Sequence, residues 1–174
     1  MVAYSPLEIE GLDWACITKM DLEETVVPRQ TEGNVDFFSE YIRRYHYYDL
    51  FLIHPRGKIF YTVIHEADYG TNLMGGPFAD SNLGDLFRRV LETRRFGIVD
   101  FAPYAPSNNE PAAFIAHPLL VEGKTELVVA LQLSLDAINA IMQAREGMGQ
   151  TGETYLVGPD HLMRSDSYLD PVHH

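Results

Sequence analysis

Two polar side chains interrupt apolar stretches that are typical of buried strands. Asp100 follows the apolar residues 97–99, and His117 follows the apolar residues 114–116. Burying a charged or imidazole side chain costs free energy unless the group is paired or binds a ligand. Each could instead lie on the solvent face of its strand or be satisfied by neighbouring backbone. If both are buried, they offer an ionisable pair to a small polar ligand.

Three tyrosines could add hydroxyl groups to the same pocket. A mostly apolar pocket with a few convergent polar groups is the usual form of a small-molecule site. One tyrosine lies in a turn at residues 69–72, within a loop at 66–81 that is rich in Gly, Asp and Asn. This turn is a candidate lid, and an ordinary surface turn is the alternative. The tyrosines are Tyr61, Tyr69 and Tyr104.

Catalytic and nucleotide-binding chemistry have no positive support in the sequence. Residues 147–152 match G-x-G-x-x-G, but they close one predicted helix and open a strand. A dinucleotide fingerprint must follow a strand and open a helix, so a flexible interdomain joint is the better interpretation. No nucleophile elbow or P-loop is present, and no carboxylate pair has a spacing that implies acid–base catalysis. We therefore predict a protein that is not an enzyme and has no cofactor.

A metal site is also not indicated. The histidines fit no H-x-x-x-H or H-E-x-x-H spacing, and the single cysteine, Cys16, is remote from them. Surface or locally hydrogen-bonded histidines are the simpler interpretation. The histidines considered are His46, His54, His65, His117 and His161.

The elements that would position these residues alternate between hairpins and helices, which favours an α+β fold. Helices are predicted where apolar residues recur at helical spacing, and strands where short apolar runs end in Gly or Pro turns. Hairpins are expected at 3–19 and 153–164, a short acidic helix at 21–28, and strands at 48–53, 58–65, 100–104, 111–118 and 127–135. Three further helices are expected: one from Val35 capped by Asn34, one at 83–91, and one from Ser134 to Gly147. An exposed turn is expected at 107–110.

The composition restricts the function further. The chain has 174 residues, 46% of them hydrophobic, enough for one good core and a small annex. A formal net charge of −12 argues against nucleic acid and against anionic lipid as partners. One cysteine excludes an internal disulfide framework. No apolar run is long enough to cross a bilayer, and no leader is visible. If the parent protein is a membrane receptor, we expect this chain to be its excised soluble piece.

Four stretches of sequence resemble one known family. They are YYDLFLI at 47–53, DFAPYAPS at 100–107, PAAFIAHP at 111–118 and GQTGETYLVGPDHLMRSDS at 149–167. Together with the order of elements, they resemble the Cache (PDC, PAS-like) extracytoplasmic sensor domain of methyl-accepting chemotaxis proteins and sensor kinases. The resemblance implies a central antiparallel sheet of about five strands flanked by helices.

The same resemblance implies a site and a ligand class. Tyr61 and Tyr69 would form the pocket wall or lid, and the floor strands would present Asp100, Tyr104, Phe114 and His117. Ligands of the family are small carboxylates such as pyruvate, lactate and acetate, with urea and amino acids in some members. The Arg, Trp, Tyr and Asp set of the amino-acid receptors is not visible here, which favours a carboxylate.

The resemblance further implies a membrane-anchored, periplasmic receptor that signals across the membrane in chemotaxis, with a possible homodimer. The alternative is a module without a ligand of its own, which docks a periplasmic binding protein or a partner subunit.

The family resemblance also divides the chain into three parts. Residues 31–146 form one sensor module, residues 1–30 resemble the end of a second module, and residues 147–174 resemble its start. The chain would then come from a tandem array or a rearranged gene, and the two terminal hairpins could pair with each other or with those of another chain.

Overall fold

The structure is a computed structural model that describes residues 2–9, 12–19 and 36–170, with side chains from residue 36 onward. The chain divides into two compact units, Met1–Tyr41 and Ile42–His174, and each is described by itself. The expected acidic helix at 21–28 and the expected cap Asn34 lie outside the described residues. The three-part division expected from the family resemblance stays a prediction.

The first unit contains the predicted N-terminal hairpin. Strands β1 (Val2–Ile9) and β2 (Leu12–Lys19) pair antiparallel, with Val2 opposite Lys19 and Ile9 opposite Leu12. Helix α2 (Phe37–Tyr45) begins in the same unit. The backbone N–H of Ser39 donates to Asp36 Oδ1 at 2.8 Å, so the Asp36 carboxylate satisfies one of the free donors at the helix start.

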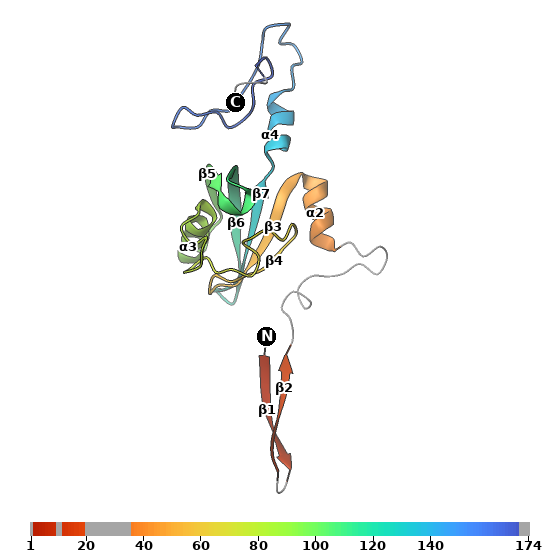
Figure 1. The fold of residues 1–174 in the computed structure, drawn as a ribbon, viewed down its shortest axis with the longest axis vertical. Helices are drawn as coiled ribbons and strands as arrows, with labels where there is room; N and C mark the ends of the chain where they lie inside the picture. Colours follow the sequence, from red (N-terminus) through yellow and green to blue (C-terminus); the bar gives the residue numbers. More distant parts are fainter. Residues whose placement is uncertain (1, 10–11, 20–35, 171–174) are drawn as a thin grey trace. The chain divides into compact units, whose positions relative to one another are not determined.

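The second unit is built on a five-stranded sheet with the strand order β4-β3-β7-β6-β5 (Figure 1). Every pairing in the sheet is antiparallel, which confirms the predicted α+β fold. The interior strand β3 has no exposed side chain from residue 49 to residue 53, because both faces of the sheet are covered there. The strands are β3 (Tyr47–Ile53), β4 (Ile59–Thr62), β5 (Gly97–Tyr104), β6 (Glu110–Val121) and β7 (Lys124–Leu133).

Helix α3 (Asn82–Thr93) covers one face of this sheet and contacts β5, β6 and β7 (Figure 1). The Ser81 hydroxyl caps the helix by accepting the N–H of Gly84 at 3.1 Å. Gly97 allows the close approach of helix and sheet, since a Cβ atom there would lie 2.8 Å from Leu86 and 2.9 Å from Val90. The fully buried side chains of α3 are Leu83, Leu86, Phe87 and Val90.

The segment at residues 63–81, which joins β4 to α3, is tied to the start of β4. Backbone hydrogen bonds run from Ile59 N to Thr71 O at 3.0 Å, from Gly70 N to Ile59 O at 3.0 Å, and from Leu73 N to Gly57 O at 2.9 Å. Leu73 is fully buried in the core. The turn at 69–72 that we expected as a lid is therefore anchored at its base, and opening it requires breaking these bonds.

Two connections differ from the sequence prediction. The 107–110 turn is exposed at residues 108–110 as predicted, but Ser107 is buried at the end of the short 3-10 helix η1 (Ala105–Ser107), where its hydroxyl donates to a carboxylate. Helix α4 (Leu135–Met142) is capped by Ser134 as predicted, but it ends before Gly147.

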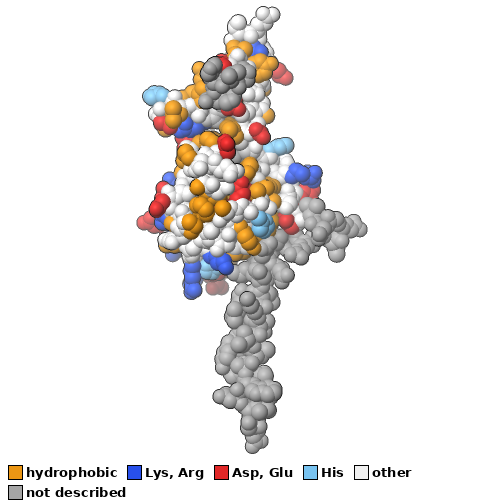
Figure 2. All heavy atoms as spheres, in the orientation of Figure 1, with side chains coloured by type: hydrophobic (Ala, Val, Ile, Leu, Met, Phe, Trp, Pro, Cys, Tyr) orange, Lys and Arg blue, Asp and Glu red, His pale blue; other side chains and the backbone are white. Residues whose placement is uncertain are grey.

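The stretch after α4 forms turns held by one arginine. Arg145 Nε donates to Gly152 O at 3.0 Å, and Arg145 Nη2 donates to Gly149 O and Gln150 O, both at 2.9 Å. The residues that match G-x-G-x-x-G thus open no helix. The C-terminal hairpin is present only as a short pairing around the bridge of Val157 with Met163. On the face of the second unit seen in Figure 2, hydrophobic side chains lie among charged ones.

Candidate functional site

A group of buried polar side chains lies on the face of the sheet that α3 covers. Asp49 on β3 is the register partner of Gln132 on β7, and Gln132 is in turn the partner of Phe114 on β6. Directly opposed residues of antiparallel strands share a face. Asp49 therefore shares its face with the core residue Phe51, two positions along the same strand. Asp49 is 0% exposed and Gln132 is 4% exposed.

Asp49 ties its own strand to the start of the 63–81 segment. Its Oδ1 atom accepts the backbone N–H groups of Leu50 at 2.7 Å, Val63 at 2.9 Å and Ile64 at 3.2 Å. Its Oδ2 atom is buried and has no hydrogen-bond partner. One oxygen of the carboxyl group thus organises the backbone, while the other remains available.

Asp68 and Tyr104 form the second part of the group. The Tyr104 hydroxyl donates to Asp68 Oδ2 at 2.6 Å, and both residues are fully buried. The Tyr104 ring packs edge-to-face on Phe114, with 4.9 Å between ring centroids. Asp68 Oδ1 is buried without a partner, as is Gln132 Oε1. Three buried acceptor oxygens in the group are therefore unsatisfied.

Glu66 links the group to the surface. Its Oε2 atom accepts the Ser107 hydroxyl at 2.6 Å, and its Oε1 atom accepts the hydroxyl of Tyr48, which is 41% exposed, at 2.8 Å. Gln132 Nε2 donates to Ser107 Oγ at 3.4 Å, which closes the chain back to β7. We call this set the acidic cluster: Tyr48, Asp49, Glu66, Asp68, Tyr104, Ser107 and Gln132.

Burial raises the pKa values of the two aspartates in the acidic cluster. Loss of solvent raises the pKa of Asp49 to about 7, against the opposing effect of its backbone hydrogen bonds. Burial also raises the pKa of Asp68, and the hydroxyl of Tyr104 offsets part of that rise. Within residues 36–170, the ion pairs join Arg88 to Asp85 and Arg164 to Asp100 and Asp160. No described basic side chain therefore neutralises the acidic cluster.

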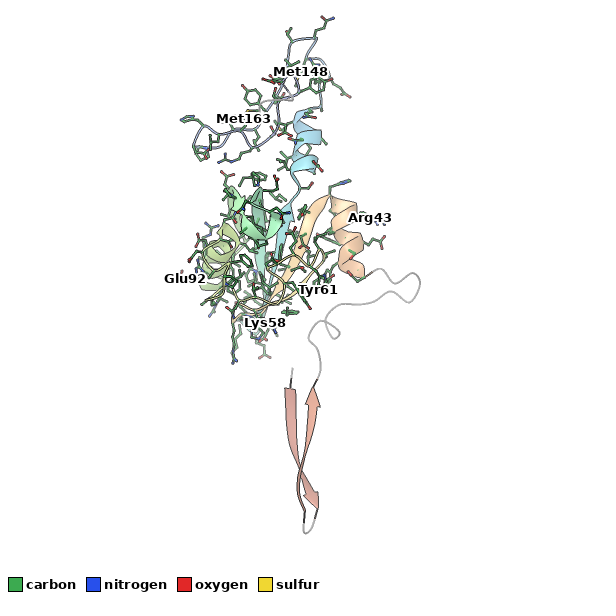
Figure 3. All side chains as sticks on the ribbon, in the orientation of Figure 1. Arg43, Lys58, Tyr61, Glu92, Met148 and Met163 are labelled. Atoms are coloured by element: carbon green, nitrogen blue, oxygen red, sulfur yellow. The ribbon has the colours of Figure 1, made fainter. Side chains whose placement is uncertain are left out.

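The structure brings two of the expected site residues to this cluster. Tyr104 belongs to it, and Phe114 is the apolar surface beneath Tyr104. Tyr61 is buried on β4 and is a register partner of Leu52 (Figure 3). The ring of His65 lies between Tyr61 and Tyr69, with centroid distances of 6.2 Å and 4.5 Å.

The other two expected residues lie elsewhere. His117 is exposed on β6, and its Nδ1 lies 2.9 Å from the carbonyl oxygen of Pro118. Asp100 has a half-exposed side chain on β5, where it pairs with an arginine. Both side chains are hydrated or paired outside the core, so neither carries the cost of burial that singled it out.

Sequence reasoning missed Asp49, Glu66, Asp68 and Gln132. Asp49 stands between Tyr48 and the apolar residues 50–53, so the argument used for Asp100 applied to it equally. Asp68 lies in the polar loop at 66–81, where an aspartate is common and nothing in the sequence marks it as buried.

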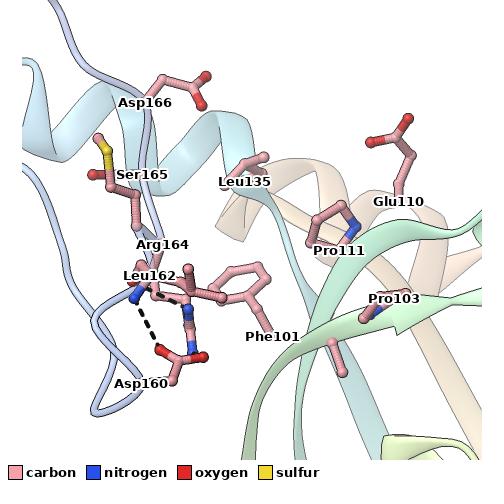
Figure 4. A pocket seen from close by; sticks show the side chains of 12 residues that line it. Phe101, Pro103, Glu110, Pro111, Leu135, Asp160, Leu162, Arg164, Ser165 and Asp166 are labelled. Atoms are coloured by element: carbon pink, nitrogen blue, oxygen red, sulfur yellow. Dashed lines mark hydrogen bonds and ion pairs between the residues drawn. The ribbon is translucent and has the colours of Figure 1, made fainter. Parts of the chain in front are cut away.

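An open cleft of about 590 Å³ lies between β5, β6 and the C-terminal segment, and Arg164, the partner of Asp100, lines it (Figure 4). Arg164 fills part of this cleft. Its Nε and Nη2 atoms donate to the two carboxylate oxygens of Asp100 at 3.0 and 2.8 Å, Nη2 also donates to Asp160 at 2.8 Å, and Nη1 donates to Leu162 O at 3.1 Å. All three nitrogens of the guanidinium are engaged, so the cleft offers a ligand no free cation from this side chain. We call this the arginine joint: Asp100, Asp160 and Arg164.

Among the described residues, no group of three or more His, Cys, Asp or Glu side chains could hold a metal ion. In the same part of the chain, no helix is long and apolar enough to cross a membrane.

Comparison with known proteins identifies the fold. No protein-family model matches the sequence, and a search of curated proteins gives no match. Solved structures of bacterial sensory domains do match. The sensory domain of the Campylobacter jejuni chemoreceptor Tlp3 has a TM-score of 0.53 at 12% identity, over 76% of this chain and 50% of that one. The chain therefore has the fold of the Cache-type sensor domains of chemoreceptors, as the sequence predicted.

Two further structures contain ligands. The ligand-binding domain of the Pseudomonas aeruginosa amino acid chemoreceptor PctC, in complex with GABA, matches with a TM-score of 0.51 and 14% identity, over 72% of this chain and 52% of that one. The Tlp3 domain with 4-methylisoleucine matches with a TM-score of 0.53 and 11% identity, over 74% and 47%. This chain spans about half the length of these domains.

Proposed function

We propose that this chain is a ligand-binding part of the periplasmic sensor region of a membrane-anchored chemoreceptor, and that the acidic cluster is its binding site. The observation that carries the proposal is a set of three buried, unpartnered oxygens, two on an otherwise apolar sheet face and one on Asp68 in the 63–81 segment. An unsatisfied buried acceptor costs about 1–3 kcal/mol, so a ligand that satisfies these atoms gains that free energy. The Cache-type fold supports the same proposal.

The ligand would act on the 63–81 segment. Asp49 holds the start of that segment through Val63 and Ile64, while Glu66 and Asp68 are part of it. A ligand held between Asp49 and Asp68 would favour the closed position of the segment over an open one. It can shift that equilibrium only by the difference of its affinities for the two states. The chain itself performs no reaction in this scheme.

The signal would leave the sheet through α2 and α4. Helix α2 precedes β3, which carries Asp49, and α4 follows β7, which carries Gln132. A homodimer and a second module formed from residues 1–30 and 147–174 belong to this proposal as well.

Ligand class has two candidates. The family resemblance favours a small carboxylate, and the raised pKa of Asp49, about 7, would let a protonated Asp49 donate to it. An amino-group ligand would instead use the carboxylates as acceptors, and the related domains with GABA and 4-methylisoleucine hold ligands with an amino group. The pH dependence separates the two candidates. Carboxylate binding would strengthen as the pH falls below about 7, and amine binding would strengthen as the pH rises.

A thermal-shift screen tests the function. The purified chain is heated with acetate, pyruvate, lactate, propionate, urea, GABA and the amino acids, each at matched ionic strength. A ligand at about a hundred times its dissociation constant should stabilise the fold by about 2.7 kcal/mol, which is readily measured. A selective shift supports the sensor function. A flat result with folded, ligand-free protein contradicts it.

The docking module is the second candidate function. Leu119 and Val121, at the β6–β7 turn, are 53% and 51% exposed, and exposed apolar side chains that lie together mark interaction surfaces. A flat screen together with binding of a periplasmic binding protein would favour this candidate.

A further inference from the structure

We propose that the acidic cluster binds the ammonium group of a small amine, so that the ligand of this domain is a cation. This inference rests on the proposed function, since it assigns the ligand class of the same site. It departs from the small carboxylate that the family resemblance favours.

The hydrogen-bond inventory is the first reason. The hydroxyls of Tyr48, Tyr104 and Ser107 each already donate to a carboxylate. The unsatisfied atoms are all acceptors: Asp49 Oδ2, Asp68 Oδ1 and Gln132 Oε1. An alkylammonium group offers three N–H donors and no acceptor. An ammonium therefore complements the cluster, whereas a carboxylate ligand adds more acceptors to a group that has too few donors.

Charge is the second reason. Asp49, Glu66 and Asp68 interact electrostatically, since Asp68 disfavours ionisation of Asp49 and Glu66 disfavours ionisation of Asp68. None of the three forms an ion pair with a described Arg, Lys or His. A buried cation would stabilise the ionised forms of these carboxyls, while an anion would disfavour them further.

An organic cation fits better than a metal ion. Three backbone N–H groups already occupy Asp49 Oδ1, and hydroxyls occupy both oxygens of Glu66. The cluster thus has one open oxygen on each of Asp49, Asp68 and Gln132, fewer than the six to eight oxygens that Ca²⁺ takes. Among the described residues, no side-chain group has the arrangement of a metal site.

The location also limits the size of what enters. Asp49 is fully buried and bonded to the start of the 63–81 segment, and Asp68 is fully buried within that segment. The cluster reaches solvent at the Tyr48–Glu66 hydrogen bond. The aromatic surface of Tyr104 and Phe114 lies beside Asp68. A primary amine on a short alkyl chain could place its head among the three oxygens and its carbons along these rings.

The test compares amines with matched neutral and anionic molecules on the full chain. The pairs are butylamine with butyrate, ethanolamine with ethylene glycol, and putrescine with 1,4-butanediol. Binding of each compound is measured by thermal shift and by calorimetry at constant chloride. We expect selective stabilisation by amines and an affinity that rises between about pH 6 and pH 8, as Asp49 ionises. Sodium, potassium and calcium chloride serve as inorganic controls.

Variants assign any amine binding to the cluster. Asp68→Asn and Asp49→Asn should each weaken binding of the best amine at least about tenfold, since each removes a charged acceptor. Asp85→Asn removes an exposed carboxylate on α3 and should leave the affinity unchanged. If Asp68→Asn does not fold, Gln132→Leu takes its place, because it removes one open acceptor and only a 3.4 Å donor contact.

The outcomes are distinct. Amine binding that is lost in the cluster variants supports the inference. Selective binding of a carboxylate overturns it and leaves the sensor function standing, and a flat response to every small molecule overturns both. Amine binding that survives both aspartate variants, or an equal shift with an inorganic cation, also overturns it.

Discussion

The acidic cluster and the arginine joint place the same residue type in opposite surroundings. In the joint, Asp100 and Asp160 are about half exposed and share one guanidinium, which lowers the pKa of both carboxyls. In the cluster, Asp49 and Asp68 are fully buried without a described cation, and burial raises the pKa of both. In the joint a guanidinium pairs with the carboxylates, whereas in the cluster no described cation pairs with them.

This difference favours the acidic cluster over the arginine joint as the ligand site that we propose. Two carboxylates around one arginine form a structural contact that fastens the C-terminal segment to β5. Buried carboxyls with open oxygens are costly to keep, and perturbed ionisable groups of this kind gather at functional sites. The open cleft at the arginine joint is therefore a less suitable ligand site than the buried cluster.

The largest expected effect is on the pH dependence of stability. Asp49 has a pKa of about 7 in the folded chain and an ordinary value of 3.8 when unfolded. The folded state binds the extra proton between these values, so stability should fall as the pH rises from about 4 to 7 and then level off. At about 1.4 kcal/mol per pKa unit, the loss is roughly 4 kcal/mol at most. Urea titrations of the wild type from about pH 5 to pH 8 measure it.

Asp49→Asn is the control for this slope. The amide keeps an oxygen for the N–H groups of Leu50, Val63 and Ile64 and removes the buried charge. The variant should be more stable than the wild type at about pH 8 and should lose most of the slope. An unchanged slope would mean that Asp49 is not the titrating group. A variant that gains stability and loses ligand binding would separate the functional role of Asp49 from its structural one.

The next effect concerns the partner of Asp68. Tyr104→Phe removes the hydroxyl that donates to Asp68 Oδ2 at 2.6 Å and leaves the buried carboxyl with no side-chain donor in the described structure. We expect a loss of about 1–3 kcal/mol in the free energy of unfolding, measured in urea near neutral pH. Tyr155→Phe, at an exposed tyrosine of the C-terminal segment, should cost much less. Equal costs for the two variants would contradict the burial of an unsatisfied acceptor.

The sequence predicted the fold better than the site, for a physical reason. Strands and helices follow local patterns, and these gave β1, β2, β3 and α3 nearly as they are. A site depends on which face each side chain occupies and on residues far apart in the chain. Asp49 and Gln132 become neighbours only through the β3–β7 register, across 83 positions of sequence. Asp100 follows the same local pattern as Asp49, yet its side chain is half exposed and pairs with Arg164.

The smallest effect is expected at the arginine joint, and its sign is opposite to that of the cluster. Asp100→Asn weakens an exposed contact that solvent and salt screen, so global stability should change little. The contribution of Asp100 is present above its ordinary pKa of 3.8 and is lost as the pH falls through its lowered pKa, whereas the contribution of Asp49 is lost as the pH rises.

Hydrogen exchange measures the effect of Asp100→Asn locally. Exchange of the amide groups in residues 156–164 should become faster in low salt, and the difference from the wild type should shrink in high salt. Exchange in β3 should not change, and binding of any ligand of the acidic cluster should be the same as in the wild type. A loss of ligand binding in Asp100→Asn would contradict the separation of the two regions, because it would mean that the joint takes part in the site.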